Sequence, residues 1–196
     1  MWLNKLGAAA AAGQSVVIRQ TFYHGHYALI GEDLQPNPDF WVSALYKKLV
    51  GRKVFKINGH ENNGNTLRLF AHCSKKINYH YHDAKLYQYP RIVIFGLNLS
   101  NRTEVVELES RVRIREYKLS PSYGNLSSRG TLLNGKSLYL ENGWKVPALG
   151  GKGINELKLG PYEMAFWTYN EAKYTNNEMG VWTSDVAKNT NICSNS

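Results

Sequence analysis

Short β-rich runs separated by clusters of Gly, Asn, Ser and Pro fill the chain from Lys53 onward and constrain its fold more than any other feature. This texture is typical of an antiparallel β-sandwich. The apolar run at residues 92–97 shows no polar alternation, which predicts a central strand covered on both faces. Asn134-Gly135 predicts a type I′ hairpin turn, because this dipeptide accepts positive φ angles. The predicted strands are residues 53–57, 66–72, 91–99, 103–108, 111–119, 131–133, 136–140, 163–169 and 181–186.

The first fifty residues have a different pattern. Residues 1–12 predict a helix, residues 16–20 a buried strand, and residues 38–50 a second helix with Asn37 at its N-cap and Pro38 at its first position. This order fits the last strand, loop and helix of a (β/α)8 barrel. The expected fold class is therefore mixed, with one β/α unit of a barrel followed by an antiparallel all-β sandwich. The expected domains are residues 1–51 for the barrel fragment and 52–196 for the sandwich.

The charge balance favours a polyanionic partner. The chain has 24 Lys and Arg residues against 15 Asp and Glu, a formal net charge of +9. Such a field attracts nucleic acid, acidic membranes or acidic polysaccharides, although solubility alone accounts for it equally well. No pattern of a known nucleic-acid-binding module occurs, so we expect no nucleic acid. No apolar run approaches the roughly 18–20 residues of a membrane span, which leaves at most peripheral membrane contact.

The two cysteines, Cys73 and Cys193, are too far apart for a CxxC motif or a zinc knuckle. We expect a long-range disulfide, which on the chain-entropy model would stabilise the fold by roughly 5 kcal/mol. Three acceptor sequons begin at Asn98, Asn101 and Asn125. Together these features favour an oxidising, secretory compartment.

Several ordered motifs of the chain resemble the C-terminal part of the heparanase family, glycoside hydrolase family 79. The resemblance implies a parent enzyme with a (β/α)8 barrel followed by a β-sandwich. It also implies retaining endo-β-glucuronidase activity on heparan sulfate, with hyaluronan as the substrate of some members. The motifs are WLNKLG at residues 2–7, RQ at 19–20, PDFW at 38–41, KKLVG at 47–51, AHC at 71–73, LNL at 97–99, LLNG at 132–135 and the tail around Cys193.

Catalytic residues are not expected in this chain. Retaining hydrolysis needs two carboxyl groups about 5 to 5.5 Å apart, and the resemblance implies that both glutamates precede the chain, the nucleophile in a Gly-Glu-Thr-Ser motif that is absent here. Glu32 and Asp33 lie in a polar loop, and Asp39 lies in the first turn of the second helix, where it would stabilise the helix dipole. We therefore expect the parent to be an enzyme and this chain alone to be inactive.

The substrate-binding candidates are Gln20, Gly25 and Tyr27, which by resemblance match positions that contact the sugar, Gly25 through its backbone amide. A Gln amide at a strand end can bridge hydroxyl groups, and a Tyr ring suits a sugar face. The alternative is structural, with Gln20 capping backbone and Tyr27 packing. The loop is one residue shorter than in human-type heparanase and carries His24 and His26, which leaves the substrate preference open.

A further candidate for glycan contact is the alternating series Arg111, Arg113 and Arg115, which would line one strand face with guanidinium groups. Arg geometry suits bidentate contact with sulfate, although protection of an edge strand explains the pattern nearly as well.

The pairs His24/His26 and His80/His82 have a spacing that zinc sites use, but each lacks a third ligand in its own segment. We expect neither a metal nor a cofactor.

The sequence thus predicts the C-terminal fragment of a secreted or lysosomal heparanase-like glycosidase. Its expected partners are heparan sulfate or a related acidic glycosaminoglycan and the rest of the parent barrel. Two alternatives remain open: a noncatalytic relative that binds a glycosaminoglycan or a receptor, and a parent that cleaves hyaluronan.

Overall fold

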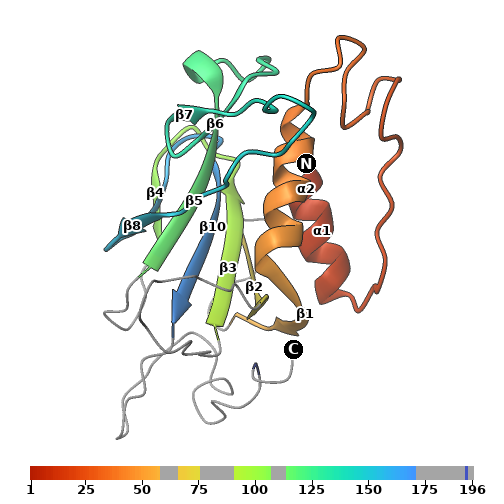
Figure 1. The fold of residues 1–196 in the computed structure, drawn as a ribbon. Coiled ribbons are helices and arrows are strands. Elements are labelled where there is room, and N and C mark those ends of the chain that lie inside the picture. The colour runs from red at the N-terminus through yellow and green to blue at the C-terminus, as the bar shows by residue number, and fades with distance from the viewer. Residues whose placement is uncertain (58–65, 76–90, 107–113, 171–192, 194–196) are drawn as a thin grey trace, which may run out of the picture.

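Two α-helices precede ten β-strands in the described part of the chain (Figure 1). The computed structural model describes residues 1–57, 66–75, 91–106, 114–170 and 193. The elements are α1 (Trp2–Ala11), α2 (Pro38–Leu49), β1 (Val50–Phe55), β2 (Leu67–Ser74), β3 (Arg91–Asn98), β4 (Glu104–Val106), β5 (Ile114–Pro121), the 3-10 turn η1 (Ser122–Gly124), β6 (Thr131–Leu133), β7 (Lys136–Ser137), β8 (Lys152–Ile154), β9 (Leu157–Leu159) and β10 (Met164–Asn170).

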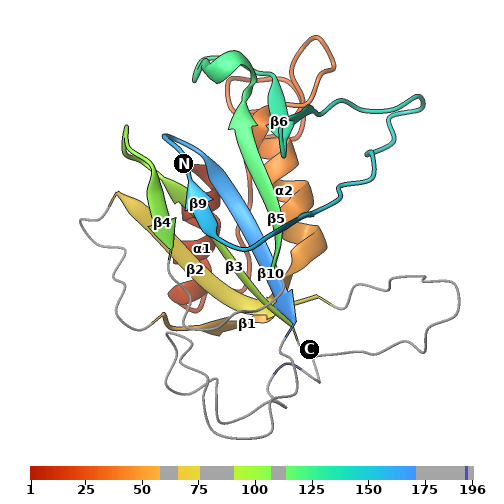
Figure 2. The ribbon, with the colours of Figure 1, turned by 90° about the vertical axis from the view of Figure 1, so that its left-hand side faces the viewer.

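One large antiparallel sheet forms the centre of the molecule. Its strand order is β1-β2-β3-β10-β5-β6-β7, and β8 pairs with β5 outside this path. The short strands β4 and β9 form a separate two-stranded sheet. Figure 2 shows β4 and β9 in front of the large sheet and the helices behind it. The large sheet is therefore covered on both faces, by helices on one and by the small sheet on the other.

The helical face is held by aromatic and aliphatic side chains. Helix α2 buries Trp41, Val42, Leu45 and Leu49, at the spacing that puts them on one side of a helix. On the sheet, Phe95 stacks between two neighbours, with ring centroids 5.5 Å from Phe70 and 5.6 Å from Phe166. Gly7 lets α1 approach this layer closely, because a Cβ atom there would overlap the Phe70 ring.

The opposite face packs against the small sheet. Leu157 and Leu159 of β9 and Val106 of β4 enter a second core with side chains of the large sheet that include Trp167 and Tyr169. These strands alternate buried and exposed positions, as in β9, where Lys158 between the two leucines is exposed. This pattern is typical of an outer layer with one face buried against the core and the other exposed to solvent.

Two local predictions are confirmed. Residues 92–97 lie in β3, at the middle of the large sheet, and all of them are buried. Asn134 and Gly135 connect β6 to β7 with φ angles of 49° and 82°, which are the positive values of a type I′ turn. The described strands form a mostly antiparallel β-sheet domain, which is consistent with the predicted sandwich.

The prediction of a buried strand at residues 16–20 is wrong. This segment is irregular, and Val16 and Ile18 expose 72% and 82% of their surface. A strand needs a partner for its backbone N–H and C=O groups, and no described strand pairs with this segment. The barrel fragment of the predicted fold class is not shown by the structure, in which residues 1–49 contribute two helices that pack on the sheet.

Other boundaries differ in detail. The predicted strand at residues 136–140 forms a ladder only over β7, and Leu138 and Leu140 pack against the helical core in irregular backbone. Strands β8 and β9 carry no strong sequence signal and were not predicted. The predicted strand at residues 181–186 and parts of those at 103–108 and 111–119 lie outside the described residues.

The predicted boundary between residues 51 and 52 falls inside β1, which follows α2 without a linker. Both helices share one core with the large sheet, since Trp41 and Leu45 pack in the same cluster as Phe95. Within this chain, the first 51 residues form one packing unit with the strands that follow.

The predicted disulfide between Cys73 and Cys193 is present, with a Cα–Cα distance of 5.5 Å. It links Cys193 to β2. In the described residues, no helix has the length and apolar character needed to cross a bilayer.

Candidate substrate-binding loop

The segment from Gln20 to Asn37, here called loop 20–37, folds back on itself before α2 begins. Its backbone forms a small ladder, in which the amides of Leu29 and Ile30 donate to the carbonyls of Thr21 and Phe22 over 3.1 and 2.9 Å. The amide of Asn37 donates to the carbonyl of Leu29 over 2.8 Å. The loop is therefore held by backbone hydrogen bonds although most of its side chains face solvent.

The three predicted substrate contacts lie in this loop and are exposed. Tyr27 exposes 71% of its surface, and Gln20 and Gly25 are also exposed. Gly25 has a φ of 116°, a conformation that L side chains rarely adopt, and its carbonyl accepts the amide of Ala28 over 3.2 Å. The structural alternative of a packed Tyr27 therefore does not describe this chain, whereas the predicted contact with sugar remains a prediction.

Each acidic side chain of the region lies close to a basic side chain. Asp39, in the first turn of α2, lies 2.5 Å from the Arg19 guanidinium, which in turn lies 5.1 Å above the Trp2 ring. Glu32 lies 3.7 Å from His24, and both are largely exposed. These contacts favour the structural interpretation of the carboxylates over a role as catalytic acids.

Asp33 is held most firmly. The Arg129 side chain donates to both of its carboxylate oxygens, over 3.0 and 2.8 Å. Hydrogen bonding from Arg129, followed by that from the backbone amide of Gln35, lowers the pKa of Asp33 below its ordinary value. Asp33 therefore stays ionised under the conditions in which a general acid of a glycosidase must carry a proton.

Arg129 itself was not singled out by the sequence analysis. It lies between η1 and β6, more than ninety positions from loop 20–37. Nothing in the local pattern marks it, since it stands in a Ser-rich and Gly-rich turn region. Its partner choice depends entirely on the folded arrangement.

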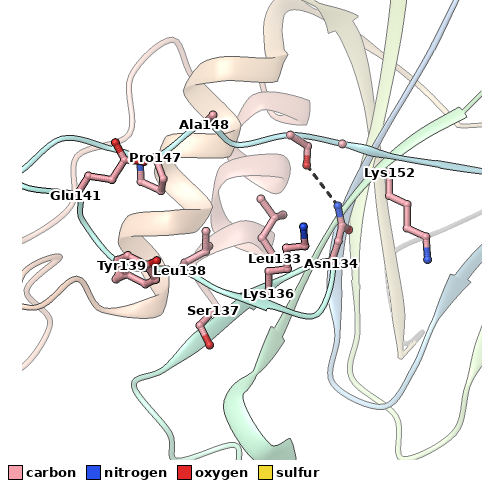
Figure 3. A pocket seen from close by; sticks show the side chains of 12 residues that line it. Leu133, Asn134, Lys136, Ser137, Leu138, Tyr139, Glu141, Pro147, Ala148 and Lys152 are labelled. Atoms are coloured by element: carbon pink, nitrogen blue, oxygen red, sulfur yellow. Dashed lines mark hydrogen bonds between the residues drawn. The ribbon is translucent and has the colours of Figure 1, made fainter.

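A surface cavity of about 660 Å³ was also missed, because it is formed by irregular backbone between β7 and β8 (Figure 3). Leu133, Leu138 and Pro147 contribute apolar surface, and Lys136 and Lys152 contribute cationic groups. The segment that encloses the cavity is fastened at two points. The Lys48 ammonium donates to the carbonyl of Leu149 over 2.6 Å, and the Asn134 side chain donates to the carbonyl of Gly150 over 3.4 Å.

The predicted arginine series is only partly visible. Arg111 and Arg113 lie outside the described residues. Arg115 is exposed on β5, where it stands opposite Gly153 of β8 and Thr168 of β10. Contact of this series with glycan remains a prediction.

The histidine pairs give no metal centre in the described residues. His24 and His26 are exposed in loop 20–37, and His80 and His82 lie outside the described part. Among the side chains that the structure describes, no group of three or more His, Cys, Asp or Glu residues could hold a metal ion.

The three predicted glycosylation sites differ in how far their side chains are exposed. Asn101 and Asn125 are exposed, whereas Asn98 is only 1% exposed. The Asn98 amide nitrogen donates to the carbonyls of Arg102, Leu159 and Gly160 over 2.6, 3.2 and 3.0 Å. A glycan on this nitrogen would replace these contacts, which favours a structural role for Asn98, and glycosylation at all three sequons remains a prediction.

Comparison with known proteins identifies relatives of the chain by sequence. No family model matches the chain. A protein named hyaluronoglucuronidase from Hirudo nipponia is 34% identical over 174 residues, which cover 87% of this chain and 35% of the relative. Heparanase from Bos taurus is 32% identical over 181 residues, covering 88% of this chain and 32% of the relative. A human protein named inactive heparanase-2 is 32% identical over 185 residues, with coverage of 85% and 30%.

These matches first place the chain in the class of glycosidase-related proteins. Two of the relatives carry the names of glycosidases, and the third is named as an inactive counterpart. More specifically, the chain is a heparanase-like sequence, and the resemblance to glycoside hydrolase family 79 is confirmed. The chain spans about a third of the length of the curated relatives it matches.

Proposed function

We propose that the chain is the C-terminal portion of a heparanase-like glycoside hydrolase that cleaves β-glucuronidic bonds in heparan sulfate. The observation that carries the proposal is the identity of 32% to heparanase over 88% of the chain. Cleavage would follow the retaining mechanism with two glutamates, both contributed by the upstream barrel. Without those two carboxyl groups, this chain alone hydrolyses nothing.

The role of the chain in that enzyme is to form one wall of the substrate cleft. Gln20 and Tyr27 are exposed, and Gly25 has no side chain to block access to its backbone amide. An anionic sugar would meet the amide of Gly25 and the ring and hydroxyl of Tyr27. The net charge of +9 would draw the acidic polysaccharide toward the protein.

The remainder of the barrel is the second proposed partner. Val16, Ile18 and Phe22 expose 72%, 82% and 64% of their surface in the segment that follows α1. These exposed apolar side chains lie within seven positions of one another in sequence, and contiguous exposed apolar patches mark interaction surfaces. Barrel strands next to residues 16–20 would supply the backbone partners that no described strand offers this segment.

Secretion or delivery to the lysosome fits the same proposal. The Cys73–Cys193 disulfide forms and persists in an oxidising compartment. The exposed side chains of Asn101 and Asn125 are accessible for glycosylation there.

Two other functions have specific support. The identity of 34% to a hyaluronoglucuronidase favours hyaluronan as an alternative substrate. The identity of 32% to a protein named inactive heparanase-2 favours a noncatalytic function. For that function we propose binding of a glycosaminoglycan or a receptor. All three proposals involve a surface that binds a polyanion or a receptor. They differ in whether a glycosidic bond is cleaved and in which polysaccharide carries it.

Expression of the longest natural form of the protein separates these functions. Heparan sulfate and hyaluronan are offered separately, and reducing ends are measured. Cleavage of heparan sulfate supports the main proposal, cleavage of hyaluronan the first alternative, and binding without cleavage the second. The chain of 196 residues serves as a control, and hydrolysis by this control would overturn the assignment of the catalytic groups to the barrel.

A second experiment tests the arginine series. Retention of the chain on immobilised heparin is expected to weaken steeply as salt rises, because salt screens exposed charges. The triple variant Arg111→Ala, Arg113→Ala, Arg115→Ala should elute at lower salt than the wild type. Unchanged elution would remove these residues from the proposed glycan contacts.

A further inference from the structure

Arg129 connects two parts of the chain that are far apart in sequence. Its Nη1 and Nη2 donate to Oδ2 and Oδ1 of Asp33 over 3.0 and 2.8 Å. Its Nε donates to Oδ1 of Asn37 over 2.8 Å, and Nη2 also lies 3.4 Å from the carbonyl of Gln35. Every nitrogen of the guanidinium group is therefore directed at loop 20–37.

Asn37 links Arg129 to the interior of loop 20–37 through its own hydrogen bonds. Although it occupies the N-cap of α2, its side chain makes no capping hydrogen bond. Instead, its Nδ2 donates to the carbonyl of Ala28 over 2.7 Å, and its backbone amide donates to the carbonyl of Leu29. One side-chain amide thus joins the Arg129 guanidinium to the residue that follows Tyr27.

Ala28 closes the turn that carries the candidate sugar contacts. It is only 3% exposed, and its amide donates to the carbonyl of Gly25 over 3.2 Å. The series Arg129, Asn37, Ala28 and Gly25 therefore runs without interruption from the β5–β6 connection to the turn at residues 25–28. Tyr27 stands inside this turn.

We propose that Arg129 is a positioning residue for loop 20–37, which holds the turn bearing Gly25 and Tyr27 in the shape that meets an acidic sugar. The proposal rests on the proposed function for the identity of the ligand. Restraint of a binding loop before the ligand arrives lowers the ordering entropy that binding must overcome. Arg129 touches no substrate in this role, and its effect passes through Asp33 and Asn37.

The geometry, rather than the charge alone, carries this effect. The side chains of Arg129 and Asp33 are about half exposed, at 49% and 52%, and a simple exposed ion pair contributes little. A planar guanidinium that binds both carboxylate oxygens and a side-chain amide adds directional bonds that a lysine ammonium cannot reproduce. Arg129→Lys should therefore retain only part of the function of Arg129.

Amide hydrogen exchange on the 196-residue chain tests the positioning directly. In Arg129→Ala, the amides of Leu29, Ile30 and Asn37 should exchange about three- to tenfold faster, because loop 20–37 opens more often. Arg129→Lys should give an intermediate rate. The matched control is Arg102→Ala, which removes the same charge from an exposed position and should leave these rates unchanged.

Core amides distinguish local loosening from general destabilisation. Phe95 and Phe166 face each other in the β3–β10 ladder, and their exchange should be the same in all variants. Unchanged exchange of loop 20–37 in Arg129→Ala would overturn the proposal. A parallel rise in the loop and core amides would do so too, because it would reduce Arg129 to a contributor to overall stability.

Binding of a heparan sulfate hexasaccharide to the same variants tests the consequence for ligand recognition. Affinity measured by calorimetry should fall about three- to tenfold in Arg129→Ala, less in Arg129→Lys, and not in Arg102→Ala. If the wild-type chain does not bind the hexasaccharide, the assigned cleft role fails while the exchange result still decides whether Arg129 positions the loop. Equal affinity of the wild type and Arg129→Ala would overturn the link between loop position and binding.

Discussion

Trp167 donates its indole N–H to Oε1 of Glu116 over 3.1 Å, and the two residues stand directly opposite each other on β10 and β5. Both side chains are buried, Glu116 with 7% of its surface exposed. Lys118 lies 3.7 Å from the same carboxylate oxygen and 3.4 Å from Glu163. A charged network is thus built into the core between the large sheet and the small one.

We expect Glu116→Ala to lower the free energy of unfolding by about 2–3 kcal/mol, because it leaves the buried Trp167 donor unsatisfied. Glu116→Gln retains an acceptor and should cost only about 1 kcal/mol. Urea unfolding of both variants measures the difference. Glu156→Gln at an exposed position is the control and should change stability by less than about 0.5 kcal/mol. Equal losses for the Ala and Gln variants would show that the indole hydrogen bond contributes nothing.

Gly7 should be intolerant of a methyl group despite its place in a helix. Alanine favours helix by about 1 kcal/mol over glycine, but a Cβ atom at Gly7 would overlap the Phe70 ring. Overpacking typically costs about 1–3 kcal/mol, so we expect Gly7→Ala to lower the free energy of unfolding by about 1 kcal/mol. Thermal unfolding gives the measurement.

A second substitution separates packing from helix propensity at this site. Phe70→Leu should relieve the overlap, so adding Gly7→Ala to that variant should stabilise it or leave it unchanged. If the Gly7→Ala variant were more stable than the wild type, that result would contradict the close approach of α1 to the sheet.

Acid should weaken the fold through His72. Its Nδ1 lies 3.0 Å from the carbonyl of Gly51, its side chain is buried, and Nε2 has no partner among the described residues. Burial lowers the pKa of His72, and the contact with Gly51 opposes this only in part. The unfolded chain, with a pKa of about 6.5, therefore binds a proton more readily than the folded one.

The stability that neutral His72 contributes is complete above about pH 6.5 and is lost as the pH falls from there toward the lower pKa of the folded state. Free energies of unfolding measured between about pH 7.5 and 4.5 should show this decline. His72→Gln, which can still donate to Gly51, should have a shallower profile over the same range. Identical slopes in the two proteins would exclude His72 as the cause.

Loss of the disulfide should lower stability markedly. The Cys73 side chain is fully buried, and its bond to Cys193 closes a loop of 120 residues. We expect Cys193→Ser to cost about 2–5 kcal/mol, with a clearly lower melting temperature and lower expression. Cys73→Ser should cost at least as much, because it also buries a hydroxyl group.

Reduction provides the matched control for this prediction. A reducing agent should lower the melting temperature of the wild type and leave that of Cys193→Ser unchanged. A melting curve that neither reduction nor substitution shifts would remove the stabilising role of this disulfide.

The features that were predicted correctly depend on neighbours in the chain. The unbroken apolar run of β3 places apolar side chains on both faces of the strand, so both faces must be buried, whichever elements bury them. The Asn134-Gly135 turn follows from the φ angles that these two residues accept, and α2 begins at Pro38 because proline suits the first turn of a helix. The exposed position of Tyr27 was also within reach, because a polar loop between two elements lies on the surface.

The features that were missed depend on partners that are distant in sequence. Residues 16–20 have the composition of a strand, but a strand exists only where another offers it a ladder, and no described strand does so. Strands β8 and β9 are three residues each and exist through pairing with β5 and β4. The ion pair between Arg129 and Asp33, which are 96 positions apart, follows from no local pattern. Propensity is a property of short segments, whereas pairing, burial and the hydrogen bonds of loop 20–37 arise when the whole chain closes around its two cores.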